Sequence, residues 1–346
     1  MINLYELSDT ELEQKLIAMG QPKFRAKQVV QWVYEKGVHD FEEMTNLPKA
    51  LRETLKQSFC FGTLSIDLEQ VSKDGTCKRL YRLHDNKLVE SVLMPYKDGR
   101  RTACISSQAG CAMGCTFCAT GQMGFARHLS AEEIFEQAQR FSQELQQRGE
   151  RLSNIVLMGM GEPFHNYKAV VEAIHLLKDR LGIGARKITV STVGLVPKIR
   201  AFAKEGLQVK LAISLHSTLD EERSAIMPIN RKYPIEELMS ACREFVDSTN
   251  RRITFEYALI NGQNDTPEEA TRLRNLLQGL MCHVNVIPLN PTAGFDGAPS
   301  DPVRIQTFID ILEAGNIPAT IRVRRGIDID AGCGQLKSKK TADQTS

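Results

Sequence analysis

From about residue 99 onward, short strand-like runs alternate with amphipathic helical runs, and this rhythm limits the chain to a small set of folds. Such alternation is typical of parallel strands joined by helices. The strands expected from it are Thr102–Ser106, Ile155–Met158, Lys187–Val193, Val209–Leu215, Ile253–Ile260 and Val284–Leu289, with one more near Ala319–Val323. Six β/α units predict an α/β fold, a partial (β/α)6 barrel.

Local signals at the starts of the intervening helices support this interpretation. Ser130 with Glu133 is typical of a capping box, and Thr266 and Asp301 are cap residues followed by proline at the first turn. In folds of this kind, the loops after the carboxyl ends of the strands build the active site. We therefore expect functional residues to gather there.

The segment before the barrel divides into a helical part and a hairpin. Ser8 begins a capping box, and apolar residues recur at helical spacing up to about residue 61. The next runs alternate apolar and polar residues around a turn at Asp85-Asn86, as in a β-hairpin. The expected organisation is a helical RNA-binding accessory domain (1–61), a β-hairpin linker (62–98), the barrel core with a C-terminal cysteine loop (99–336) and a flexible tail (337–346).

Basic and aromatic residues alternate in the N-terminal part, a composition suited to phosphate contact and base stacking. The residues are Lys23, Phe24, Arg25, Lys27, Trp32 and Tyr34. A solvated charged face above core aromatics explains the same pattern equally well. Over the whole chain, 44 basic and 42 acidic residues leave a net charge of +2, so any RNA contact must depend on local patches.

Composition also excludes some classes of protein. There is no long uninterrupted apolar run, and the N-terminus is acidic where a signal peptide would be basic and then apolar. We therefore expect a cytoplasmic protein without a membrane partner. In that compartment the nine cysteines are metal ligands, catalytic groups or packing residues rather than structural disulfides.

Three cysteines, Cys111, Cys115 and Cys118, lie within eight residues after the first barrel strand. A zinc site normally has four protein ligands, whereas the local set here has three. An iron–sulfur cubane held by three thiolates leaves one iron free to bind a substrate or cofactor. A zinc site with a distant fourth ligand and a chance grouping are the alternatives. The scattered Cys60, Cys77, Cys242 and Cys282 are interpreted as packing residues.

The motif Cys-x₃-Cys-x₂-Cys, with Phe117 before its last cysteine, resembles the signature of radical S-adenosylmethionine (SAM) enzymes. Other blocks narrow the resemblance: Ser106–Cys111, Phe117–Gly121, Gly159–Pro163, Ser214–Ser217, Met227–Asn230 and Asp328–Leu336. Together they resemble the RlmN/Cfr family of RNA adenine methyltransferases, from the N-terminal helices to about Leu336. The resemblance implies a radical SAM barrel.

This resemblance also implies cofactors and the residues that bind them. Cys111, Cys115 and Cys118 would hold a [4Fe–4S] cluster whose free iron chelates SAM. The positions that match SAM contacts are Gly161, Glu162, Ser191, Ser214, Leu215, His216 and Asn290. Taken alone, Gly161-Glu162-Pro163 would be an ordinary turn.

Catalytic roles are likewise implied by the family. One SAM would methylate Cys333, and a second would yield the radical that activates this methyl group for addition to an adenine carbon, so two SAM are used per turnover. Cys104 would release Cys333 as a transient disulfide, and Glu90 would accept a proton. Alone, either cysteine is as readily a packing residue, and Glu90 a surface glutamate. Gly332 stands where the family usually has alanine.

The family's substrates are an adenine in the peptidyl-transferase centre of 23S rRNA and, for RlmN members, an anticodon-loop adenine of tRNA. RlmN-type members methylate carbon 2 and Cfr-type members carbon 8; we expect carbon 2, because the RlmN type is commoner. An electron-donating reductase is an expected partner, and a monomer is expected. Two alternatives remain. One is a radical SAM enzyme that acts on a small molecule, and the basic and aromatic residues of the N-terminal part argue against it. The other is a non-methylating iron–sulfur protein, and the presence of both Cys104 and Cys333 argues against it.

Overall fold

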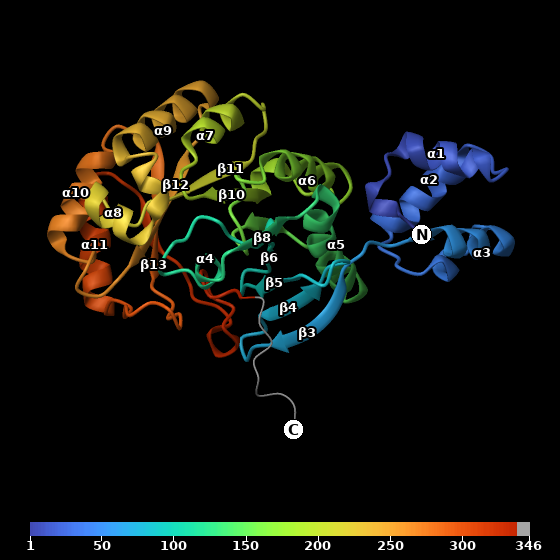
Figure 1. Ribbon diagram of the computed structural model, residues 1–346, viewed down its shortest axis with the longest axis horizontal. Coiled ribbons are helices and arrows are strands. Elements are labelled where there is room, and N and C mark those ends of the chain that lie inside the picture. Colours follow the sequence, from blue (N-terminus) through green and yellow to red (C-terminus); the bar gives the residue numbers. More distant parts are fainter. Residues whose placement is uncertain (338–346) are drawn as a thin grey trace.

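A computed structural model describes residues 1–337, and its main element is a curved sheet surrounded by helices (Figure 1). Seven neighbouring strands run parallel: β6 (Arg101–Cys104), β9 (Asn154–Leu157), β10 (Ile188–Thr192), β11 (Lys210–Ser214), β12 (Ile253–Leu259), β13 (Cys282–Pro288) and β14 (Ala319–Ile321). All seven strands expected from the sequence are present, with ends that shift by a few residues. The partial barrel is therefore confirmed.

Helices connect these strands and cover the outer side of the sheet (Figure 1). They are α5 (Ala131–Gln147), α6 (Tyr167–Asp179), α7 (Val196–Ala203), α8 (Asp220–Ile226), α9 (Ile235–Thr249), α10 (Pro267–Leu277) and α11 (Pro302–Ala314). The expected caps form: the side chains of Ser130, Thr266 and Asp301 each accept hydrogen bonds from backbone N–H groups of the first turn. Ile155, Val190 and Ile213 in the strands are fully buried, as expected for a sheet covered by helices.

Three antiparallel strands precede the barrel and extend its sheet. They are β3 (Ser65–Val71), β4 (Cys77–Arg82) and β5 (Leu88–Pro95), and β5 pairs with β6. The expected hairpin is β4–β5, and Asn86 in its turn has a φ of 63°. The sequence did not predict β3, because its alternation of Ile66 and Leu68 with polar residues breaks at Gln70 and most of this edge strand is exposed.

Residues 1–61 form the small helical part at the right of Figure 1. Its helices are α1 (Asp9–Ala18), α2 (Phe24–Val30) and α3 (Lys49–Ser58), with single turns at Leu4–Glu6, Gln31–Glu35 and Phe41–Glu43. The short strands β1 (Ile2–Asn3) and β2 (Phe59–Cys60) pair in parallel and bring its two ends together. The Ser8 capping box is confirmed. Helix α5 holds this part, because Gln139 Nε2 donates to the Val33 carbonyl at 3.1 Å.

The cysteine motif lies in a loop between two short strands, β7 (Gln108–Gly110) and β8 (Phe125–His128), which pair with each other. The loop also contains the single-turn helix α4 (Ala119–Gln122). This loop was expected directly after the first barrel strand, whereas β7 lies between that strand, β6, and the loop. Single-turn segments also occur at Ala185–Lys187, Pro228–Arg231 and Ile327–Ile329.

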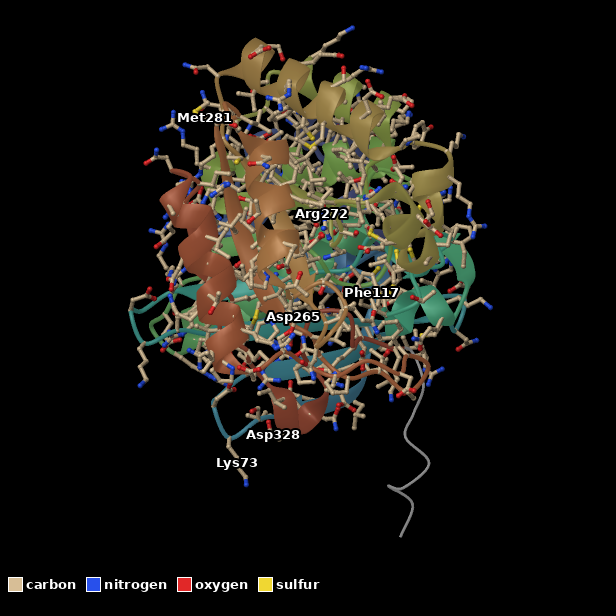
Figure 2. All side chains as sticks on the ribbon, turned by 90° about the vertical axis from the view of Figure 1, so that its left-hand side faces the viewer. Lys73, Phe117, Asp265, Arg272, Met281 and Asp328 are labelled. Carbon is tan, nitrogen blue, oxygen red and sulfur yellow. The ribbon has the colours of Figure 1, made fainter. Side chains whose placement is uncertain are left out.

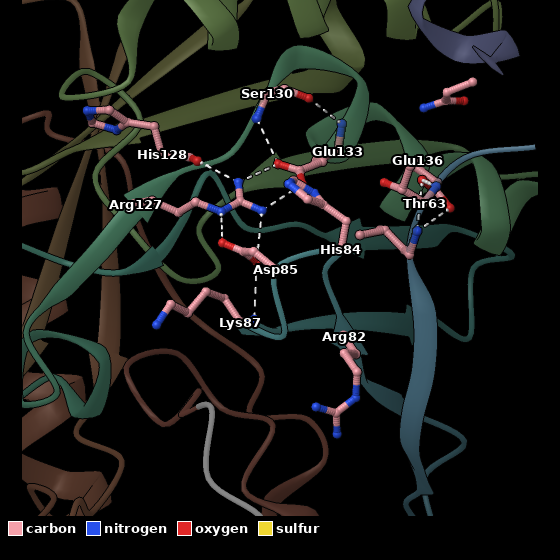
Figure 3. A network of polar contacts seen from close by, with 12 residues as sticks. Thr63, Arg82, His84, Asp85, Lys87, Arg127, His128, Ser130, Glu133 and Glu136 are labelled. Atoms are coloured by element: carbon pink, nitrogen blue, oxygen red, sulfur yellow. Dashed lines mark hydrogen bonds and ion pairs between the residues drawn. The ribbon is translucent and has the colours of Figure 1, made fainter. Parts of the chain in front are cut away.

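Arg127 of β8 joins three parts of the molecule (Figure 3). Its guanidinium donates to Asp85 in the β4–β5 turn at 2.7 Å and to both oxygens of Glu133 at the start of α5, at 2.7 and 2.8 Å. These contacts fix the antiparallel strands against the barrel beside the cysteine loop.

Within residues 1–337 there is no helix long and apolar enough to span a membrane. The expected flexible tail, residues 337–346, lies outside the described residues except for Lys337.

Candidate active site

A cavity at the carboxyl ends of the barrel strands brings together most of the residues that the sequence singled out. Its lining includes Cys115, Cys118, Gly161, Glu162, Ser191, Ser214, His216, Asn290 and Cys333. Phe117, which also lines it, is labelled in Figure 2. We call this space the first cavity.

Gly161 and Glu162 form one wall of the first cavity. Gly161 has a φ of 99°, and a Cβ there would lie 2.5 Å from the Cβ of Gln108, so only glycine fits. The carboxylate of Glu162 accepts backbone N–H groups of Phe164 and Val193, each at 2.9 Å. Burial raises its pKa to about 7. The carboxylate thus ties the β9 loop to the β10 loop and retains lone pairs for a ligand's ammonium.

His216 lies opposite, after β11, in a left-handed conformation with a φ of 61°. Its Nδ1 accepts the N–H of Ala258 at 2.9 Å, so in the neutral ring Nε2 carries the hydrogen. Burial, together with the nearby Arg223, lowers its pKa to about 3. The ring meets Phe117 edge-on at 4.9 Å. A neutral imidazole at this place gives the cavity a hydrogen-bond donor without adding charge.

Leu215 is the one expected SAM position that does not line the first cavity. Its side chain is fully buried, and its N–H donates to the Glu256 carbonyl at 3.1 Å. The sequence could not separate it from its neighbours, because a strand end alternates between cavity and core.

The three cysteines of the motif lie close enough for their charges to interact. Burial, with Cys118 nearby, raises the pKa of Cys111 to about 12, and burial with both neighbours raises that of Cys115 further. Cys111 does not line the first cavity. In the described part of the chain, no three His, Cys, Asp or Glu side chains are arranged as a metal site. The soft donor set and the mutual repulsion of its thiolates fit a cationic iron–sulfur cluster, whose charge would relieve that repulsion.

A second, smaller cavity adjoins the first and contains Cys104. Cys333 lies in the wall that both share, together with Met158, Ile287, Asn290, Arg322 and Leu336. Asn290 Nδ2 donates to the Cys333 carbonyl at 3.1 Å and so fixes this loop. A Cβ on Gly332 would lie 2.8 Å from Asn290 Nδ2, so glycine suits the packing observed here. Cys333 thus faces both spaces.

Arg322 is a site residue that the sequence analysis missed. It follows β14, lines both cavities, and its Nη1 lies 3.3 Å from Glu256 Oε2. Burial raises the pKa of both the Cys104 and the Cys333 thiols, that of Cys104 to about 12, and the positive charge of Arg322 partly opposes both shifts. A lone arginine at a strand end carries no spacing signal, so only the fold reveals it.

Arg223 of α8 is a second missed residue. Its buried guanidinium donates to four acceptors at 2.8–3.0 Å, namely the carbonyls of Val193, Ser214 and Leu215 and the side chain of Asn230. Val193 follows β10, Ser214 and Leu215 lie at the end of β11 beside His216, and Asn230 lies in the turn Pro228–Arg231. Arg223 therefore holds the strand ends that form the cavity floor.

Glu90 lines neither cavity. The carboxylate is 5% exposed; one oxygen is 3.4 Å from Lys78 Nζ, and the other accepts the Lys337 N–H at 2.8 Å. Burial raises its pKa, while Lys78 opposes the shift. In this structure Glu90 anchors the chain just after the Cys333 loop, and its role as a proton acceptor stays a prediction.

The fold and the cysteine loop define a radical SAM protein. Residues 105–273 match the model of the radical SAM superfamily. Over 98% of this chain and 100% of the other, the structure is similar to a crystal structure of a radical SAM methyltransferase from Sphaerobacter thermophilus, with a TM-score of 0.93 and 48% identity. Proteins of this superfamily use a [4Fe–4S] cluster and SAM.

More specific matches follow. Residues 2–61 match the N-terminal domain of ribosomal RNA large subunit methyltransferases. The chain is 49% identical to the dual-specificity RNA methyltransferase RlmN 1 of Myxococcus xanthus, over 97% of this chain and 94% of that one. It is 47% identical to RlmN of Anaeromyxobacter dehalogenans, over 97% and 92%. The chain therefore belongs to the RlmN family of radical SAM methyltransferases.

Proposed function

We propose that this enzyme methylates carbon 2 of an adenine in 23S rRNA and of an anticodon-loop adenine in tRNA. The relatives are named as dual-specificity RNA methyltransferases and match nearly the whole chain. The observation that carries the proposal is the place of Cys333. It belongs both to the cavity with the expected SAM positions and to the cavity with Cys104.

When bound, a [4Fe–4S] cluster held by Cys111, Cys115 and Cys118, with two SAM per turnover, would supply a methyl group and a hydrogen-abstracting radical. Cys333 then carries the methyl group on its sulfur and presents it to the adenine. Asn290 supports this role, because it holds the Cys333 carbonyl from inside the first cavity. Burial raises the pKa of the Cys333 thiol, and the charge of Arg322 opposes this shift and so stabilises the nucleophilic thiolate relative to a site without the arginine.

Release of the RNA requires the second cysteine. The Cys104 thiolate attacks the Cys333 sulfur, so an S–S bond forms as the bond from sulfur to the methylene carbon breaks. The electron pair of that bond goes to the methylene carbon, which gains a proton and becomes the methyl group. Two electrons from a reductant then reopen the disulfide. Cys104 lies at the end of β6 in the second cavity, and Cys333 is close enough to contribute, after burial, to the raised pKa of the Cys104 thiol.

Addition of the methylene radical to the adenine carbon leaves one electron and one proton to be lost. The electron would return to the oxidised cluster, and Glu90 is the proposed acceptor of the proton. Its raised pKa suits a base that must later return the proton. Because its carboxylate is held by Lys78 and by the N–H of Lys337, this role requires the Lys337 contact to open.

An unpaired adenine is the kind of base that can be presented to such a pocket. We further propose that the helical part (1–61) contacts the RNA, that a reductase supplies electrons, and that the enzyme acts as a cytoplasmic monomer. The exposed Phe24, with Arg25 over its ring at 4.9 Å, supports the RNA contact.

The test is anaerobic incubation of the cluster-loaded enzyme with SAM, a reductant and unmodified 23S rRNA fragment or tRNA, followed by mass spectrometry of the nucleosides. We expect 2-methyladenosine. Appearance of 8-methyladenosine would assign the carbon 8 reaction instead. SAM cleavage without any methylated adenosine would overturn the proposal and favour a small-molecule substrate.

A further inference from the structure

Three exposed rings lie together beside the cysteine loop, and the chemistry above does not use them. Phe125 and His128 come from β8, and His165 follows Glu162 in the loop after β9. The ring centroids of Phe125 are 5.1 Å from His128 and 5.5 Å from His165, and the two imidazoles are 4.9 Å apart. Phe125 is 42% exposed, and both histidines are exposed. We call these residues the ring cluster.

One buried side chain, that of Gln108, fixes both histidines. Its Oε1 accepts the N–H of Glu162 at 2.8 Å, which identifies its other terminal atom as the NH₂ group. That Nε2 lies 3.0 Å from Nδ1 of His128 and 3.0 Å from Nδ1 of His165, one hydrogen for each ring. Both Nδ1 atoms are therefore placed to accept, which corresponds to the tautomer with its hydrogen on Nε2 in each ring. A fully buried amide thus holds two surface rings in set orientations.

The ring cluster is directly connected to the wall of the first cavity. Gln108 packs against Gly161, and its hydrogen bond reaches Glu162, and both of these residues line the cavity. Phe125 follows Gly124, whose carbonyl accepts the Cys111 N–H at 2.8 Å. In Figure 3 the ring of His128 points away from the Arg127 network, so that network does not cover it. The rings therefore flank the site on the outside.

We propose that the ring cluster binds an unpaired nucleotide next to the target adenine, with its base stacked on Phe125 and the two imidazoles, tilted by 59° to that ring, at the edge of the base. This inference rests on the proposed function. Exposed aromatic and histidine rings are common platforms for unstacked RNA bases. The outward Nε2–H groups add neutral donors for a base edge or a phosphate. Preordering by Gln108 reduces the entropy lost on binding.

The test measures how tightly enzymes with a substitution at Phe125 bind an unmodified anticodon stem-loop. The stem-loop carries a fluorescent adenine analogue beside the target base. Phe125→Leu keeps an apolar side chain but removes the ring face, so we expect Kd to rise about tenfold and the stacking-dependent quenching to disappear. Phe125→Trp retains a ring and is expected to stay within about twofold of the unsubstituted enzyme. Met281→Ala, at another exposed apolar residue, is the control.

Methylation of Cys333 by SAM without RNA, read from the mass of the protein, reports whether each variant keeps its fold and cofactor site. We expect it to be unchanged in Phe125→Leu. An RNA affinity of Phe125→Leu equal to that of Met281→Ala would overturn the ring-cluster proposal while leaving the proposed function intact. Slower cluster reduction with unchanged RNA affinity would assign the surface to a reductase instead. Failure of the unsubstituted enzyme to bind and methylate any RNA would overturn the proposed function itself.

Discussion

Replacing Arg223 by methionine should destabilise the enzyme strongly, although this residue touches neither cofactor nor substrate in the account above. Its side chain is 1% exposed and donates four hydrogen bonds at 2.8–3.0 Å. Each acceptor left without a partner costs about 1 kcal/mol or more. The variant no longer bears the cost of burying a charged guanidinium, which offsets part of this loss. We therefore expect the free energy of unfolding to fall by about 3–5 kcal/mol.

Urea unfolding followed by circular dichroism measures this loss. Arg200→Met is the matched control, because Arg200 makes a surface pair with Glu244 at 2.8 Å, and such pairs contribute at most about 1 kcal/mol. Both variants are compared in the same cofactor state. If Arg223→Met costs no more than Arg200→Met, the four hydrogen bonds do not hold the strand ends as we argue.

Three further predictions follow from the same site. The pKa of His216 is about 3 against an ordinary 6.5, so the stability it contributes is present above pH 6.5 and is lost as the pH falls. Between pH 7 and pH 5 the free energy of unfolding of the enzyme should fall by about 2 kcal/mol more than that of His216→Asn. Asparagine keeps a hydrogen-bond acceptor for the N–H of Ala258. Equal decreases in urea titrations of the two proteins would contradict this prediction. Gly161→Ala should lower the free energy of unfolding by at least about 2 kcal/mol more than Gly182→Ala, because a Cβ at Gly182 would contact nothing. Similar decreases in the melting temperature of the two variants would refute the close approach of Gly161 to Gln108. Cys333→Ala should abolish RNA methylation and keep the cluster's absorbance, whereas loss of the absorbance would make Cys333 a ligand.

The barrel could be predicted from the sequence because its signals are local. Strand runs such as Ile253–Ile260 are buried on both faces, and caps such as Ser130 satisfy the first turn of their own helix. Strand β3 was not predicted, because most of the side chains of this edge strand are exposed and its alternation of apolar and polar residues is short.

The site was predictable only in part, for a related reason. The cysteine motif is contiguous and its spacing is visible in the sequence. The contacts of Arg322, Arg223 and Gln108 join segments that are distant in the chain, so no window of sequence contains them. The role of Glu90 as a proton acceptor stays a prediction from the resemblance; the structure shows only that its carboxylate contacts Lys78 and the Lys337 backbone.

The division of labour between Cys333 and Cys104 can be tested by trapping. Cys104→Ala leaves Cys333 able to join the RNA but removes the thiol that releases it. After anaerobic turnover we therefore expect a covalent protein–RNA adduct on a denaturing gel, with the cross-link at Cys333 by mass spectrometry. The double variant Cys104→Ala/Cys333→Ala should give none. Free methylated RNA from Cys104→Ala, or an adduct at another residue, would contradict the account.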